Sequence, residues 1–117
     1  DPMRVTIYQK PTCTTCRAVA KALAEASVDV EAVNYYVDPI PKKKLLELLN
    51  KLGIPARDLL RRNESVYKDL NIAGRDLSEE ELVDLMVLHP DLIQRPIVEM
   101  GSRAILARPA ERLREIL

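Results

Sequence analysis

The two cysteines of this 117-residue chain, Cys13 and Cys16, lie where a β-branched run gives way to an alanine-rich segment. The run from Arg4 to Tyr8 predicts a buried strand, and the segment from Thr14 to Ser27 predicts a helix. A strand, a tight turn and a helix in succession place Cys13 at a helix N-terminus, where unpaired N–H groups and the helix dipole favour a thiolate. Cys16 follows one turn later on the same face, within reach of a disulfide. The junction therefore predicts an α/β fold that carries thiol chemistry.

The rest of the chain alternates between β-rich and helical segments. The prolines of Asp38-Pro39-Ile40-Pro41 forbid helix and predict a loop. Ser78 and Glu81 have the spacing of a capping box, in which each side chain bonds the other residue's backbone N–H. The expected elements are strands over Glu31–Val37, Ile97–Glu99 and Arg103–Ala107, and helices over Lys42–Leu52, Ile54–Leu60, Ser65–Leu70, Ser78 to about Leu88, and Ala110–Leu117. Their order is β-α-β, a helical insertion and β-β-α, which we expect to form a single domain over residues 3–117.

Composition narrows the class of protein. Eighteen basic and eighteen acidic residues cancel, which argues against a general nucleic-acid surface. The apolar stretches are too short to span a bilayer, and no signal peptide precedes the first strand, so we expect a cytoplasmic protein with no membrane partner. Asp1-Pro2 ahead of Met3 resembles a remnant of an expression vector and is left out of the expected fold. Two cysteines and the lone His89 are too few for a structural zinc site, so no metal is expected.

The positions of the two cysteines predict a different chemical role for each. A free thiol has a pKa near 8.5, and lowering it to about 7 requires roughly 2 kcal/mol of preferential thiolate stabilisation. A helix N-terminus can contribute up to about 1–2 kcal/mol, and the nearby cations Lys10 and Arg17 could contribute the rest. Cys13 is therefore expected to be the nucleophile and Cys16 the resolving thiol. The alternative is a pair of inert, buried cysteines, which is common for free thiols.

A second set of candidate residues consists of arginines that are distant in sequence. Arg57 and Arg61 form a like-charge i,i+4 pair, which costs helix stability unless an anion or carboxylate offsets it. Arg95 precedes Pro96, where a cis peptide bond is feasible, and Arg108 precedes Pro109. Taken singly, each arginine also suits a solvated surface position.

Four segments carry a resemblance to a known family. They are Tyr8-x-x-Pro11-x-Cys13-x-x-x-Arg17, Leu59-Leu60-Arg61-Arg62-Asn63, His89-Pro90-x-Leu92-Ile93-x-Arg95-Pro96-Ile97-Val98, and Arg108-Pro109. On these segments the chain, from Ile7-Tyr8 to Leu117, resembles the glutaredoxin-type arsenate reductases (ArsC/Spx-like). That family shares a thioredoxin-like fold with the Spx-type regulators, so the resemblance implies this α/β fold with a helical insertion between its halves.

The resemblance also implies a reaction and a site. Cys13 would attack arsenate or a similar oxyanion, Arg61, Arg95 and Arg108 would surround the anion, and Pro96 would be a cis-proline that faces the active cysteine. Arginine suits this role because its planar fork matches the oxygens of a tetrahedral anion. The enzyme would hold no bound cofactor. Its electrons would come from an external thiol, either glutathione with glutaredoxin or thioredoxin.

Two departures from the family pattern refine this expectation. Members that use glutathione typically have His at the place of Gln9 and a residue other than cysteine at the place of Cys16. The second cysteine indicates a redox-active Cys13–Cys16 disulfide, reduced by thioredoxin or glutaredoxin. A C-x-x-C pair also occurs in the Spx-type regulators, so a redox-sensing regulator that binds RNA polymerase remains an alternative. A disulfide reductase of another substrate is a third possibility.

Overall fold

A computed structural model describes residues 4–117; Asp1-Pro2 and Met3, the proposed vector remnant included, lie outside the described residues. The chain divides into two compact units. The first, here called the sheet unit, combines residues 4–38 with Arg95–Leu117, and the second, the helical unit, is Pro39–Gln94. The predicted order of β-α-β, helical insertion and β-β-α is therefore confirmed.

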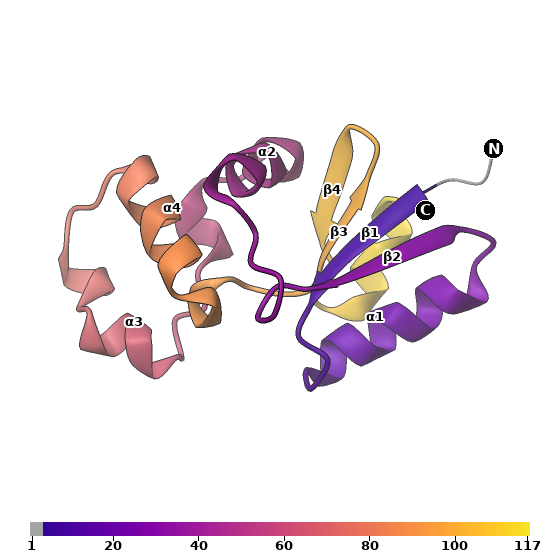
Figure 1. The fold of residues 1–117 in the computed structure, drawn as a ribbon, viewed down its shortest axis with the longest axis horizontal. Coiled ribbons are helices and arrows are strands. Elements are labelled where there is room, and N and C mark those ends of the chain that lie inside the picture. The colour runs from indigo at the N-terminus through magenta and orange to yellow at the C-terminus, as the bar shows by residue number, and fades with distance from the viewer. Residues whose placement is uncertain (1–3) are drawn as a thin grey trace. The chain divides into compact units, whose positions relative to one another are not determined.

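The sheet unit is built on a four-stranded sheet of order β2-β1-β3-β4 (Figure 1). Its elements are β1 (Arg4–Gln9), α1 (Thr14–Glu25), β2 (Asp29–Asn34), β3 (Ile97–Met100), β4 (Arg103–Leu106) and η4 (Ala110–Glu115). β1 and β2 are parallel and are joined by α1, whereas β3 runs antiparallel to both β1 and β4. The hairpin between β3 and β4 turns at Gly101, whose φ of 61° suits glycine.

Aliphatic side chains hold α1 and η4 against one face of this sheet. Period-2 alternation directs Val5 and Ile7 of β1 to that face, and Val19 and Leu23 of α1 pack on them. The core of the sheet unit consists of Val5, Ile7, Val19, Leu23, Val98, Ile105, Ala107, Leu113 and Ile116. Burying each such side chain contributes roughly 1.5–3 kcal/mol, so this cluster fixes where α1 begins relative to the strands.

The structure corrects the end of the second strand. β2 stops at Asn34 rather than Val37, because a hydrogen-bonded turn competes with the strand. The Asn34 side-chain oxygen accepts the Tyr36 N–H at 3.1 Å, and the Asn34 carbonyl accepts the N–H groups of Val37 and Asp38. Val37 is consequently 80% exposed.

Two of the predicted helices are 3₁₀-helices rather than α-helices. The segment predicted over Ile54–Leu60 is a 3₁₀-helix, η1 (Ala56–Leu59), and the closing helix is the 3₁₀-helix η4. Each follows a proline, at Pro55 and Pro109, whose carbonyl accepts an i→i+3 bond. Short segments of this kind favour such bonds over a continued α-helix.

The helical unit contains α2 (Lys42–Leu52), η1, α3 (Ser65–Asp69), η2 (Ile72–Gly74), α4 (Glu79–Leu88) and η3 (Pro90–Leu92). The predicted capping box is confirmed, since the Ser78 hydroxyl accepts the Glu81 N–H at 3.1 Å and the Glu81 carboxylate accepts the Ser78 N–H at 3.0 Å. α2 ends at Gly53 in the left-handed conformation, as its sequence signal indicates. Lys42 of α2 pairs with Glu80 and Asp84 of α4 at 2.7 and 3.0 Å.

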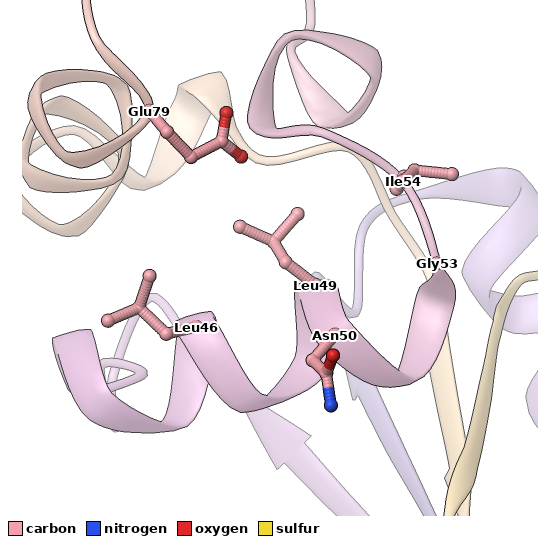
Figure 2. A pocket seen from close by; sticks show the side chains of 6 residues that line it. All are labelled: Leu46, Leu49, Asn50, Gly53, Ile54 and Glu79. Atoms are coloured by element: carbon pink, nitrogen blue, oxygen red, sulfur yellow. The ribbon is translucent and has the colours of Figure 1, made fainter.

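A shallow pocket of about 420 Å³ opens between α2 and the start of α4 (Figure 2). Its lining residues are Leu46, Leu49, Asn50, Gly53, Ile54 and Glu79. The only ionisable group in this lining is Glu79, and its carboxylate accepts the Ala56 N–H at 2.5 Å. The lining is therefore largely apolar, its one carboxylate is bonded to a backbone N–H, and it contains no nucleophilic side chain.

None of the helices formed by residues 4–117 is both long enough and apolar enough to cross a membrane.

Candidate active site

The cysteine pair lies at the edge of the sheet where both parallel strands end. The last residue pair between β1 and β2 is Gln9 with Asn34, so the turns that follow the two strands emerge at the same edge. The first of these turns is closed by the Cys13 N–H, which bonds the Lys10 carbonyl at 2.9 Å. Cys13 then serves as N-cap of α1, as predicted, with the extended φ and ψ of −78° and 126° typical of that position.

The Cys13 sulfur takes the place of the usual capping oxygen. It accepts the Cys16 N–H at 3.3 Å, which satisfies one of the free donors at the start of α1. A negative charge on the sulfur strengthens this bond and also interacts favourably with the helix dipole.

The surroundings lower the pKa of Cys13. Burial raises it, but hydrogen bonds from the Cys16 side chain and backbone, and then the hydrogen bond and charge of Arg95, outweigh that effect and bring the pKa from 9.0 to about 7. A much larger fraction of Cys13 is therefore ionised at neutral pH than of a free thiol. The main cation is thus Arg95, rather than the Lys10 and Arg17 that the sequence suggested.

The pKa of Cys16 is shifted in the opposite direction. It is fully buried on the inner face of α1. Burial and the interaction with Cys13 raise its pKa to about 12, against smaller lowering effects of the Lys10 backbone and Arg95. Cys16 therefore stays protonated near neutrality and acts as a hydrogen-bond donor to the Cys13 thiolate.

Arg95 is the buried cation of the site, with only 6% of its surface exposed. It leads into β3 through a cis peptide bond to Pro96, which confirms the isomer expected there. Its Nη1 donates to the Tyr36 hydroxyl at 3.3 Å. Burial lowers the pKa of Arg95, but interactions with Tyr35, Tyr36 and Cys13 raise it above its ordinary value, so the guanidinium stays charged.

Arg108 approaches the sulfur from the end of β4. The β3–β4 pairing continues past Ile97 and Leu106, because the Ala107 N–H bonds the Pro96 carbonyl at 3.0 Å. This register brings Arg108 beside Arg95, and its Nη1 lies 3.4 Å from the Arg95 carbonyl oxygen and 4.0 Å from the Cys13 sulfur. The Arg108–Pro109 bond is also cis, which the sequence analysis did not anticipate. Arg108 is exposed, so its guanidinium is open to an incoming anion.

The other predicted site residues have different settings. Arg61 belongs to the helical unit, where it bonds the Glu64 carboxylate at 3.0 Å and the Gln94 side chain. Its role as a third anion-binding arginine remains a prediction. The Lys10 ammonium lies 4.7 Å from the centre of the Tyr36 ring, and Arg17 is exposed on α1. Pro96 is buried next to Arg95.

Tyr35 and Tyr36 were not among the site residues predicted from the sequence. Both were expected in a strand, whereas they belong to the turn after β2 and lie at the same sheet edge as Cys13. The turn-forming Asn34 directly before two of the four tyrosines of the chain was the available signal.

The chemistry available at this edge is that of a nucleophile combined with an anion site. One buried and one exposed guanidinium can hold an oxyanion next to the Cys13 thiolate, although the anion and the thiolate carry like charges. Among residues 4–117, no group of three or more His, Cys, Asp and Glu side chains could hold a metal ion.

Comparison with known proteins places this geometry in a family. The sequence profile of the ArsC family matches residues 8–116. The uncharacterized protein YfgD of Escherichia coli (strain K12) is 41% identical over 115 residues, which cover 97% of each chain. An arsenate reductase of the same organism is 34% identical over 113 residues, covering 97% of this chain and 80% of that one. A solved structure of an arsenate reductase from Vibrio cholerae is 33% identical, covers 100% of both chains and has a TM-score of 0.95, which confirms the predicted thioredoxin-like α/β fold. The chain therefore belongs to the ArsC family, as the resemblance of its motifs indicated.

Proposed function

We propose that this chain is a thiol-dependent arsenate reductase, with Cys13 as the nucleophile, Cys16 as the resolving thiol and external thiols as the source of electrons. The observation that carries the proposal is the position of the Cys13 sulfur, which accepts the Cys16 N–H at the start of α1 at 3.3 Å and lies 4.0 Å from the Arg108 guanidinium. A pKa lowered to about 7 supports it. The family membership and the arsenate reductases among its relatives support the choice of substrate.

The first step forms a bond between sulfur and arsenic. Arg108 and Arg95 would bind the arsenate oxygens, and the Cys13 thiolate would attack the arsenic atom. One oxygen of arsenate leaves as water after taking up two protons, so arsenic stays in the +5 state in the adduct. The guanidinium charges act in this step, because they offset the repulsion between a thiolate and an anion.

The second step transfers two electrons. The Cys16 sulfur attacks the Cys13 sulfur, the S–As electron pair goes to arsenic, and arsenite leaves as Cys13–Cys16 becomes a disulfide. Cys16 must lose its proton for this attack. Its high pKa comes partly from the neighbouring Cys13 sulfur, and that contribution weakens once Cys13 is bound to arsenic and no longer charged. An external dithiol or glutathione then reduces the disulfide.

The test is arsenate-dependent NADPH oxidation, coupled in separate assays to thioredoxin with its reductase and to glutathione with glutaredoxin. We expect turnover with at least one system and none for Cys13→Ser. Cys16→Ser should still bind arsenate but should require glutathione for turnover. Ser27→Ala, beyond the far end of α1, serves as the control and should match the unmodified protein.

The outcomes separate the parts of the proposal. Unchanged turnover of Cys16→Ser with thioredoxin would rule out the intramolecular disulfide while leaving the reductase activity standing. Absence of turnover with both reductants, together with binding to RNA polymerase, would replace the enzyme by the Spx-like regulator. The cytosol, which keeps thiols reduced, is the compartment that this cycle requires.

A further inference from the structure

The turn after β2 places an aromatic ring among the cations of the cysteine site. Asn34 fixes this turn through its bond to the Tyr36 N–H, and the parallel pairing of β1 with β2 sets it beside the turn that leads to Cys13. Tyr35 is 1% exposed and its ring centre lies 5.1 Å from that of Tyr36. Tyr36 thus packs against a buried ring and is itself only partly buried.

Tyr36 contacts two cations at once. The Lys10 ammonium lies 4.7 Å from its ring centre and the Arg95 guanidinium carbon 5.9 Å from it, both within the range of cation–π attraction. The Tyr36 hydroxyl also accepts the Arg95 Nη1 hydrogen bond at 3.3 Å. The Tyr36 side chain therefore restrains both the Arg95 guanidinium, which interacts with Cys13, and the Lys10 ammonium from the turn after β1.

We propose that Tyr36 is a positioning residue of the Cys13 site, whose ring and hydroxyl fix where the Arg95 guanidinium and the Lys10 ammonium lie. Arginine and lysine have long side chains with many rotamers. Burial and Tyr35 already restrict the Arg95 guanidinium, and Tyr36 further narrows the positions that it and the partly buried Lys10 ammonium can take. Tyr36 acts on the thiolate through Arg95, and it acts on the oxyanion by keeping both cations in place. Only the second effect rests on the proposed function.

The experiment measures the pH midpoint of Cys13 alkylation by iodoacetamide, which requires no arsenate. The groups that face this sulfur are Cys16 from α1, Arg95 ahead of β3 and Arg108 after β4, and the variants leave all three in the sequence. We expect Tyr36→Leu to raise the midpoint by about 0.5 pH unit, because the Arg95 contribution weakens without being lost. Tyr36→Phe keeps the ring and loses the hydroxyl, so its midpoint should rise by about 0.3 pH unit.

The matched control is Tyr67→Leu on α3 of the helical unit, which should leave the midpoint unchanged. In arsenate reduction, Tyr36→Leu should raise KM by more than it lowers kcat. A purely structural role of Tyr36 would lower the melting temperature without moving the midpoint, and that result would overturn the inference. If Tyr36→Leu does not fold, Tyr36→Phe decides: a raised midpoint supports the positioning role and an unchanged one refutes it. A shifted midpoint in a chain without arsenate turnover would refute the proposed function and leave the role of Tyr36 intact.

Discussion

Replacing Arg95 by methionine should raise the pKa of Cys13 by about one pH unit. The folded protein lowers this pKa from 9.0 to about 7, a hundredfold change in the ratio of thiolate to thiol. The lowering contributions together exceed this net change, because they also offset the effect of burial, and Arg95 supplies the two smaller of the four. Methionine fills a similar volume without charge, so a position that is 6% exposed stays filled. A rise of about one reduces the thiolate at pH 7 from about half to roughly a tenth of the molecules, equivalent to about 1.4 kcal/mol.

The assay for this change is again the pH midpoint of iodoacetamide alkylation. Cys16 is fully buried and has a pKa of about 12, so the reaction near neutrality reports Cys13. Arg103→Met is the matched control, since Arg103 begins β4 at the opposite end of the β3 pairing and bonds the Glu115 carbonyl. A midpoint that stays near 7 in Arg95→Met would show that the helix terminus and Cys16 are sufficient to ionise the thiol.

Arg95→Lys distinguishes charge from shape. Lysine retains the positive charge but not the planar fork, so the pKa of Cys13 should lie between its values in Arg95→Met and in the unmodified protein. The KM for arsenate should stay raised, because a point charge cannot bind two oxygens in the manner of a guanidinium. Equal KM values for Arg95→Lys and the unmodified protein would remove Arg95 from the proposed anion site.

Three further expectations concern single features of the structure. Arg108→Ala should raise the KM for arsenate at least tenfold while moving the Cys13 alkylation midpoint little, and an unchanged KM would exclude it from binding the anion. In urea unfolding, the free energy of unfolding of the reduced protein should rise by about 1–2 kcal/mol from pH 7 to pH 9, because the folded pKa of Cys13 lies below its unfolded value and solvent screens part of the effect. From pH 9 to pH 12 the free energy of unfolding should fall, because the pKa of Cys16 is raised. Cys13→Ser should abolish the rise between pH 7 and pH 9 but not this fall. Ser78→Ala should lower the free energy of unfolding by about 1 kcal/mol through loss of the cap, whereas Ser65→Ala, in a helix whose N-cap makes no side-chain bond, should not.

Segments with strong local signals could be predicted from the sequence. The helix Lys42–Leu52, the capping box at Ser78 and the position of Cys13 at a helix start all rest on interactions within about one turn of chain. The end of β2 could not be predicted in the same way, because Tyr35 and Tyr36 favour a strand by propensity and the Asn34 hydrogen bonds decide otherwise. The 3₁₀-helices at η1 and η4 have the same apolar spacing as short α-helices, so their tighter bonding was not evident.

The residues around Cys13 were enough to predict a thiol at the N-terminus of the first helix, because neighbouring residues suffice to form a helix end and its dipole. The cations that surround this thiol could be identified only from the fold. Arg108 is separated from Cys13 by 95 residues, and Arg95 from Tyr36 by 59. These side chains meet because parallel pairing brings the ends of β1 and β2 to one edge of the sheet, and antiparallel pairing of β3 with β4 returns two arginines to it. Strand register sets such meetings, and register depends on the packing of the whole sheet.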